Sequence, residues 1–145
     1  MSESELPHPS KIIPHRLPFL FLDRVSLCQD MEIYGHYRFT RDNPIFEGHF
    51  PEQAIVPGVL ILEGGAQTLA YWALSQKPNH LVLLTGVDQA KWNTQVLPEE
   101  DIIYQVKVLK IKLGLVIADL KVYVNEKEVC QARIKGYLKS KSSPK

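Results

Sequence analysis

Residues 57–76 read PGVLILEGGAQTLAYWALSQ, and this stretch decides the fold. It is too long for a β-strand, and its opening Pro-Gly suits a first helical turn, because the N–H that proline lacks has no partner there. We therefore predict a helix from Pro57 to Ser75, about 28 Å long at 1.5 Å per residue. Its apolar residues run almost all round the helix, which indicates that protein surrounds it on nearly every side.

Six other segments have the pattern of strands, and the clearest alternate apolar and polar residues, as half-buried strands do. In the clearest, DIIYQVKVLKIK, the apolar Tyr104, Val106 and Val108 share one face. The last three segments are separated by short turns, which predicts an antiparallel meander. The six predicted strands span residues 19–27, 31–40, 80–92, 101–112, 115–124 and 128–138. The simplest arrangement is an α+β fold in which one antiparallel sheet curls around one buried helix.

A chain of 145 residues fits one domain. Residues 1–10 and 140–145 are polar and contain proline, so we predict flexible tails there and a single folded domain over residues 11–139. Lys and Arg number 17 against 16 Asp and Glu, and the resulting net charge of +1 gives no basic field for nucleic acid.

The cellular compartment is also predicted from composition. The longest apolar run, near residues 59–74, is interrupted by Glu63, two glycines and Gln67, so it is neither a signal peptide nor a membrane span. Two cysteines, Cys28 and Cys130, are more typical of reduced, inert thiols than of a disulfide in a chain of this length. We expect a cytoplasmic protein.

Several common kinds of site lack their motifs. The five histidines show no HExxH or comparable metal-ligand spacing. No serine lies in a G-x-S-x-G turn, no glycine-rich phosphate loop follows a predicted strand, and neither cysteine belongs to a C-x-x-C pair. The sequence therefore does not favour metal, hydrolase-triad, nucleotide or redox chemistry.

Glu63 places a carboxyl group on the predicted buried helix. Burying an unpaired carboxylate is costly, so Glu63 should retain a proton, as a general acid does, or have a partner. A structural alternative is that it reaches the helix end or pairs with Arg16 or Arg24. Gln67 lies one turn further on the same face, and it can hydrogen-bond either to Glu63 or to a backbone carbonyl.

His49 lies in the loop FEGHFPEQ, ahead of the helix. Imidazole exchanges protons near neutral pH, so His49 is the natural base for a proton-abstraction step. A single loop histidine can equally be structural or solvated.

The stretches PHRLPFLFLDRV, GHFP and VPGVLILEGGAQ, in this order and spacing, resemble the (3R)-hydroxyacyl-[acyl carrier protein] dehydratases of the FabZ type. The resemblance covers about residues 11–139. It implies the hotdog fold, in which an antiparallel sheet wraps a long central helix. It also implies a homodimer, which in this family can form trimers of dimers, with each site built from the histidine of one subunit and the carboxylate of the other.

The implied reaction is dehydration of (3R)-3-hydroxyacyl-acyl carrier protein to the trans-2-enoyl product, in fatty acid or related polyene-type chain biosynthesis. His49 would take the α-proton, and Glu63 would protonate the leaving hydroxyl. Isomerising relatives have Asp at the position of Glu63, which favours the simple dehydratase branch. Because the phosphopantetheine arm arrives with the substrate, no metal, nucleotide or prosthetic group is expected.

The resemblance assigns further roles. The backbone N–H of Gly58 would stabilise the thioester oxygen. The implied dimer suggests that a neighbouring helix or the substrate approaches Gly64 and Gly65. The remaining expected contacts are Val59, Gln67, Phe50 and Trp92 for substrate, and Lys91, with a weaker signal, for carrier-protein docking.

The chain departs from the family pattern at three places. Leu17 stands where Tyr is usual, AKWNTQ around Trp92 has only one basic residue beside the aromatic, and PEED replaces PGD. We expect the first two to affect substrate and carrier choice and the third to be a turn variant. Two alternatives are a hotdog acyl thioesterase, which lacks motif support, and a non-catalytic acyl-binding subunit, which would be marked by loss of His49 or Glu63.

Overall fold

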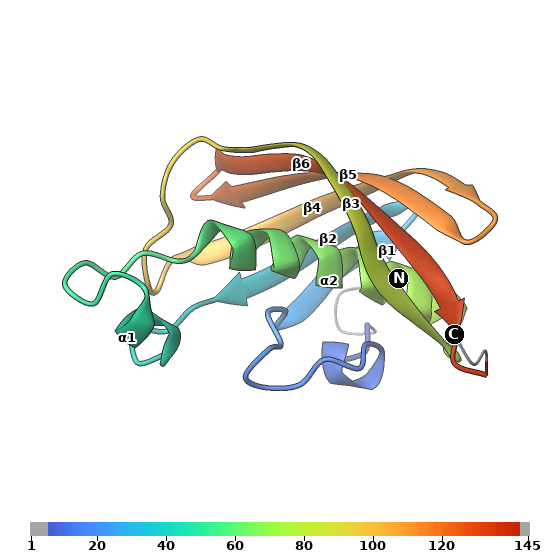
Figure 1. Ribbon diagram of the computed structural model, residues 1–145, viewed down its shortest axis with the longest axis horizontal. Helices are drawn as coiled ribbons and strands as arrows, with labels where there is room; N and C mark the ends of the chain where they lie inside the picture. The colour runs from blue at the N-terminus through green and yellow to red at the C-terminus, as the bar shows by residue number, and fades with distance from the viewer. Residues whose placement is uncertain (1–5, 143–145) are drawn as a thin grey trace.

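One long helix lies across a six-stranded antiparallel sheet in the computed structural model, which describes residues 6–142 (Figure 1). The strand order is β1-β2-β4-β5-β6-β3, so β1 and β3 form the two edges. The elements are η2 (Pro9–Lys11), β1 (Arg24–Gln29), β2 (Glu32–Arg38), α1 (Ile45–Gly48), α2 (Gly58–Gln76), β3 (His80–Trp92), β4 (Asp101–Lys112), β5 (Leu115–Val124) and β6 (Lys127–Ser140). The predicted α+β arrangement is confirmed.

The helix α2 matches the predicted bounds to within one residue, but its burial is uneven. Every residue from Gln67 to Leu74 is buried. Near the start of the helix, Val59 is 68% exposed, and Leu62 and Glu63 are only partly covered. The expected all-round burial therefore holds for the second half of α2 within one chain, and its first half presents apolar surface.

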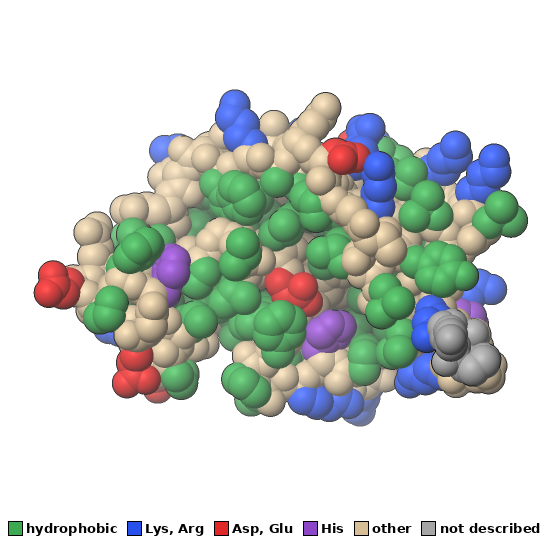
Figure 2. All heavy atoms as spheres, viewed as in Figure 1, with side chains coloured by type: hydrophobic (Ala, Val, Ile, Leu, Met, Phe, Trp, Pro, Cys, Tyr) green, Lys and Arg blue, Asp and Glu red, His purple; other side chains and the backbone are tan. Residues whose placement is uncertain are grey.

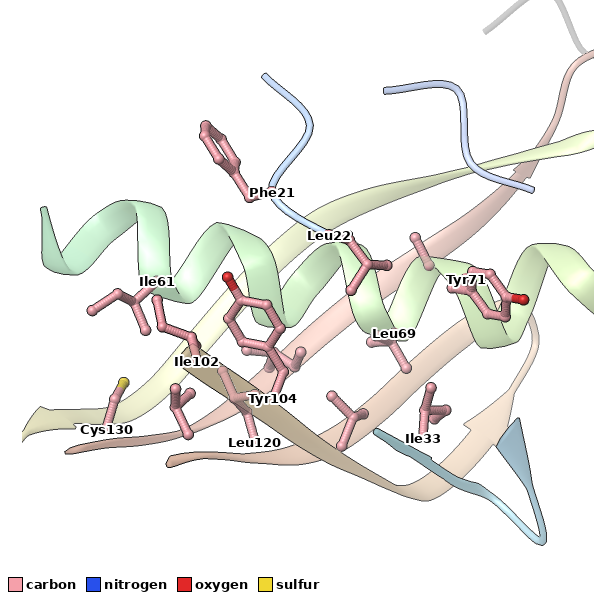
Figure 3. Close-up of a cluster of buried hydrophobic side chains, with 14 of the residues drawn as sticks. Phe21, Leu22, Ile33, Ile61, Leu69, Tyr71, Ile102, Tyr104, Leu120 and Cys130 are labelled. Carbon is pink, nitrogen blue, oxygen red and sulfur yellow. The ribbon is translucent and has the colours of Figure 1, made fainter. Parts of the chain in front are cut away.

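The core lies between α2 and the concave face of the sheet. Alternate residues of the three meander strands point inward, as their pattern predicts, and Figure 3 shows part of this cluster. Fully buried side chains of β2, β4, β5 and β6 meet the helix here. The largest buried side chains of the core include Leu22, Ile33, Ile61, Leu69, Tyr71, Ile102, Tyr104, Leu120 and Ile134.

The predicted strand over residues 19–27 is wrong in its first half, because β1 begins only at Arg24. The apolar residues Leu20 to Leu22 are buried as a strand would bury them. However, the backbone at Phe19 and Phe21 hydrogen-bonds to the side chain of Gln67 and not to a neighbouring strand. The other five strands are present, with ends shifted by at most two residues.

The N-terminal boundary of the folded part is earlier than predicted. Leu6 packs against the core, Pro9 is buried, and the Tyr71 hydroxyl donates to the carbonyl oxygen of Pro7 at 2.8 Å. At the other end, β6 extends to Ser140. Residues 1–5 and 143–145 lie outside the described residues, so the predicted flexibility of those segments stays a prediction.

Two adjacent glycines let α2 approach the sheet closely. A Cβ at Gly64 would lie 2.7 Å from Cε1 of Tyr104, and one at Gly65 would lie 2.6 Å from Cδ1 of Leu120. The groups that need this space are side chains of β4 and β5 from the same chain. The expectation that a neighbouring helix or the substrate approaches these glycines is therefore wrong.

We predict that Gly65→Ala lowers the free energy of unfolding by about 2 kcal/mol or more, because the added methyl overpacks against Leu120 by more than the gain in helix propensity. Urea denaturation measures this loss. Gly48→Ala is the control, since no heavy atom lies within 4 Å of a Cβ at that position, and it should change stability by less than about 0.5 kcal/mol. Equal stability of the two variants would contradict the close contact.

Candidate active site

A groove of about 270 Å³ lies between the helix α2 and the strands β3 and β6. Figure 2 shows hydrophobic side chains gathered over the middle of this face of the molecule, around an acidic and a histidine side chain. The residues that line the groove are His15, Glu63, Ala66, Gln67, Leu69, Ala70, Val82, Leu83, Leu84 and Gly136. A mostly apolar wall with few polar groups is typical of a small-molecule site.

Glu63 has two polar partners, and both approach the same oxygen. Gln67 Nε2 donates to Glu63 Oε2 at 3.0 Å, and His15 Nε2 lies 3.7 Å from that oxygen. The expectation of a partner is confirmed. Among residues 6–142, the ion-pair partner of Glu63 is His15 and not Arg16 or Arg24. Arg16 instead donates to backbone carbonyl oxygens of the N-terminal segment.

Gln67 connects the helix to the N-terminal segment. Its side chain makes three hydrogen bonds: Oε1 accepts from the Phe21 N–H at 2.8 Å, and Nε2 donates to the Phe19 carbonyl at 2.9 Å and to Glu63. The two roles considered for Gln67, holding Glu63 and satisfying a backbone carbonyl, are therefore both present.

Gln67→Leu is predicted to lower the free energy of unfolding by about 2–4 kcal/mol. The substitution leaves the Phe21 N–H and the Phe19 carbonyl without their partner, and each unsatisfied buried group costs about 1–3 kcal/mol. Chemical denaturation followed by circular dichroism measures the change. Gln76→Leu, at the exposed end of the same helix, should stay within about 0.5 kcal/mol of wild type. A comparable loss in both variants would show that the hydrogen bonds of Gln67 contribute little.

His49 is held at the end of the short helix α1. Its backbone N–H donates to the Ile45 carbonyl at 3.1 Å, and the buried Phe46 fixes α1 against the core. The ring nitrogen Nδ1 lies 2.8 Å from the Ile55 carbonyl oxygen. Since a carbonyl can only accept, Nδ1 carries a proton, and in the neutral ring Nε2 has the lone pair. His49 is thus in the tautomer that a general base needs.

Phe50 follows His49 in a left-handed backbone conformation, with φ of 55°. This conformation places its ring centroid 4.3 Å from that of His49, and the ring is 56% exposed. The Phe50 carbonyl accepts from the Gln53 N–H at 2.8 Å, which closes the turn. Phe50 therefore packs beside the His49 imidazole. A residue expected to contact the substrate thus lies next to the proposed base.

The start of α2 brings together Gly58, Val59, Trp92 and Lys91. The indole N–H of Trp92 donates to the Gly58 carbonyl at 3.1 Å, and its ring occupies the space where a Cβ of Gly58 would lie. The N–H groups of a first helical turn have no partner within the helix, so the Gly58 N–H is suited to bind a developing anion. Lys91 is exposed one residue before Trp92, at the end of β3.

The structure does not bring all the predicted site residues close together within one chain. Glu63 and Gln67 face the groove, whereas Gly58 and Trp92 lie more than one turn away toward the helix start. Across the described part of the chain, no hydrogen bond or ion pair links His49 to Glu63.

Sequence reasoning missed His15. It lies in PHRLPF, the segment that carries part of the family resemblance, yet only Arg16 and Arg24 were considered as charged partners of Glu63. The position of His15 within that motif is the sequence feature that could have identified it.

The predicted state of the cysteines is confirmed, since Cys28 and Cys130 are both free. Burial raises the pKa of Cys130 to about 11 and also raises the pKa of Cys28. Neither thiol is therefore a nucleophile at neutral pH.

A larger hollow of about 840 Å³ lies beside β1, β2 and β4, on another part of the surface. Its lining includes Arg38, which pairs with Asp101 at 2.8 Å. Leu17, one of the departures from the family pattern, lines this hollow and is 79% exposed. Because neither His49 nor Glu63 lines it, we assign it no part in the chemistry.

Comparison with known proteins gives consistent matches. A family model described as a FabA-like domain matches residues 13–133. The 3-hydroxyacyl-[acyl-carrier-protein] dehydratase FabZ of Sulfurovum sp. (strain NBC37-1) is 36% identical over 140 residues, which cover 90% of this chain and 94% of the relative. The protein of the same name from Fusobacterium nucleatum subsp. nucleatum is 41% identical over 125 residues, covering 84% and 88%.

Among solved structures, the dehydratase heterocomplex ApeI:P from Xenorhabdus doucetiae matches with a TM-score of 0.82 at 15% identity, over 94% of this chain and 93% of that chain. This likeness, together with the helix lying across its sheet, defines a hotdog-fold protein. The chain belongs to the FabZ-type dehydratases of the FabA-like family. The resemblance seen in the sequence is therefore confirmed.

Proposed function

We propose that the protein dehydrates (3R)-3-hydroxyacyl-acyl carrier protein to trans-2-enoyl-acyl carrier protein. The observation that carries this proposal is the pair of proton-transfer groups in a FabZ-type chain. The Nδ1 contact of His49 leaves Nε2 as the basic nitrogen of the neutral ring, and the Glu63 carboxyl is held by Gln67 in an apolar groove.

The chemistry follows from these groups. The thioester carbonyl acidifies the neighbouring α-carbon, so His49 Nε2 can remove its proton. The electron pair forms the α–β double bond, the bond from the β-carbon to oxygen breaks, and the hydroxyl leaves as water with the proton of Glu63. The Gly58 N–H stabilises negative charge on the thioester oxygen, a contribution typically worth about 3–4 kcal/mol. The proton left on His49 returns to Glu63 through solvent before the next turnover.

The active site is proposed to form between two copies of the chain. Three observations support this arrangement: His49 and Glu63 make no contact within the described residues of one chain, Val59 on α2 is 68% exposed, and the edge strand β3 presents Leu83 and Leu84 at 45% and 46% exposure. An exposed apolar edge strand is a natural pairing surface for a second chain. Assembly into a trimer of dimers stays a prediction.

The substrate is proposed to arrive on the phosphopantetheine arm of acyl carrier protein, so the reaction requires no bound metal, nucleotide or prosthetic group. Carrier proteins are acidic, and exposed Lys91 beside Trp92 is the proposed docking cation.

Between residues 6 and 142, no helix is long and apolar enough to cross a membrane. We propose a cytoplasmic location.

His49→Ala and Glu63→Gln are each predicted to slow the interconversion of 3-hydroxyacyl and trans-2-enoyl thioesters on carrier protein by at least about 100-fold, since each removes one proton-transfer group. Absorbance of the enoyl thioester measures the rate, and circular dichroism checks that both variants are folded. Wild-type protein that leaves these thioesters unchanged but releases free thiol would replace this proposal with the thioesterase alternative. Wild type that does neither would favour a subunit that only binds acyl chains.

Mixing the two inactive variants tests the shared site. In a hybrid dimer, one of the two sites receives a native His49 from one subunit and a native Glu63 from the other. Random exchange of subunits should therefore restore about a quarter of wild-type activity. The His49→Ala protein alone, taken through the same subunit-exchange procedure, is the control and should stay inactive. If full subunit exchange restores no activity, the two residues act within a single chain.

A further inference from the structure

His15 is a polar residue of the groove that has no role in the reaction proposed above. It belongs to the segment before β1, lines the groove beside Glu63, and has a side-chain exposure of 24%. Its Nε2 faces Glu63 Oε2 at 3.7 Å. Its Nδ1 is buried and has no hydrogen-bond partner within residues 6–142. A half-buried imidazole with one nitrogen unbonded and the other facing a carboxyl group requires an explanation.

The protonation state of His15 follows from its surroundings. Burial lowers its pKa, Glu63 acts in the opposite direction, and Arg16 adds to the lowering. The groove walls contributed by β3 and β6 are Val82, Leu83, Leu84 and Gly136, which carry no charge. His15 is therefore neutral at neutral pH and carries a single ring proton.

The position of that proton is determined by Glu63. A proton on Nδ1 would leave a buried donor without a partner and would direct the lone pair of Nε2 at a carboxyl oxygen. A proton on Nε2 directs an N–H at Glu63 Oε2 instead. The distance of 3.7 Å is longer than a hydrogen bond, and catalytic contacts of this kind commonly shorten when substrate binds.

Both partners of Glu63 therefore face the same oxygen. Gln67 Nε2 donates to Oε2 at 3.0 Å, and His15 approaches that oxygen from the N-terminal segment. An oxygen that accepts one N–H group and faces a second is a poor place for the acidic proton. The proton of the carboxyl group belongs on Oε1, the oxygen that neither donor approaches.

We propose that His15 is a positioning residue of the dehydration site, which together with Gln67 directs the acidic proton of Glu63 to Oε1 for delivery to the substrate hydroxyl. The inference rests on the proposed dehydratase function. It assigns His15 a role through Glu63, without direct contact with the reacting atoms.

Two substitutions separate the N–H donor from the volume of the ring. His15→Gln keeps an N–H at a similar reach, and His15→Phe keeps a ring without a donor. We expect His15→Phe to lower kcat for the hydroxyacyl thioester about tenfold with little change in KM, because a misplaced proton slows the chemical step and not binding. We expect His15→Gln to retain kcat within about threefold of wild type.

The pH dependence supplies a readout that a merely structural role would not move. An N–H directed at a carboxyl oxygen opposes protonation of that group in general, so removal of the donor should extend the active range toward higher pH. In His15→Phe, the alkaline limb of the kcat/KM profile should therefore move up by about one pH unit. His80→Phe is the matched control, because His80 also has a buried Nδ1 without a partner in the described chain but lies outside the groove. Its profile should coincide with that of wild type.

Two results would overturn the proposal. The first is that His15→Phe keeps the wild-type kcat and pH profile. The second is that His15→Gln and His15→Phe are equally slow with unchanged pH profiles, which would indicate that only the volume of the ring matters.

NMR of the ¹⁵N-labelled imidazole tests the contact without any activity measurement. An Nε2–H tautomer supports the inference, and an Nδ1–H tautomer contradicts it. Wild-type protein that is inactive on every carrier-bound thioester would instead overturn the proposed function, so the two failures are distinguishable.

Discussion

The close approach of the helix α2 to its sheet at Gly64 and Gly65 is the constraint on which the rest of the structure depends. Tyr104 of β4 and Leu120 of β5 occupy the space that two Cβ atoms would otherwise fill (Figure 3). Successive residues of a helix point about 100° apart, so fixing these glycines toward the sheet directs their neighbour Glu63 to the side of the helix. The carboxyl group therefore enters the groove beside β3, where apolar side chains limit its contact with water.

The second constraint is the side chain of Gln67, which takes the place of a neighbouring strand. The backbone of Phe19 and Phe21 would normally pair with a sheet edge, but it pairs with this one amide. The same amide holds Glu63, so the position of the carboxyl group and the path of the N-terminal segment are set together. Because that segment carries His15, the motifs PHRLPF and LEGGAQ meet at a single site although they are far apart in sequence.

Much of the fold could be predicted because it depends on periodicity. Alternation located β4 and β5 to the residue, and length and composition located α2 within one residue. The prediction failed where hydrogen bonds come from side chains, since the apolar run at residues 19–22 has the composition of a strand but its backbone at Phe19 and Phe21 bonds to the Gln67 side chain. It also failed for the partners of Gly64 and Gly65, because a pattern shows that space is needed but not what fills it.

The candidate site, like the fold, could be predicted from the sequence only in part. The sequence motifs pointed to His49, Glu63 and Gln67, and local order placed Gln67 one turn from Glu63. The tautomer of His49 could not be predicted, because it depends on how the loop returns to bring the Ile55 carbonyl within 2.8 Å. His15 was missed because its contact with α2 depends on the tertiary path of the chain.

Two of the three departures from the family pattern, Leu17 and Trp92, have different structural surroundings. Leu17 is 79% exposed and lines the hollow beside β1, β2 and β4, outside the groove that holds Glu63. Trp92 covers the start of α2 and donates its indole N–H to the Gly58 carbonyl at 3.1 Å. A phenyl ring at that position could fill the space but could not make this bond. The indole thus fixes the peptide plane that follows Gly58, next to the N–H proposed to hold the thioester oxygen.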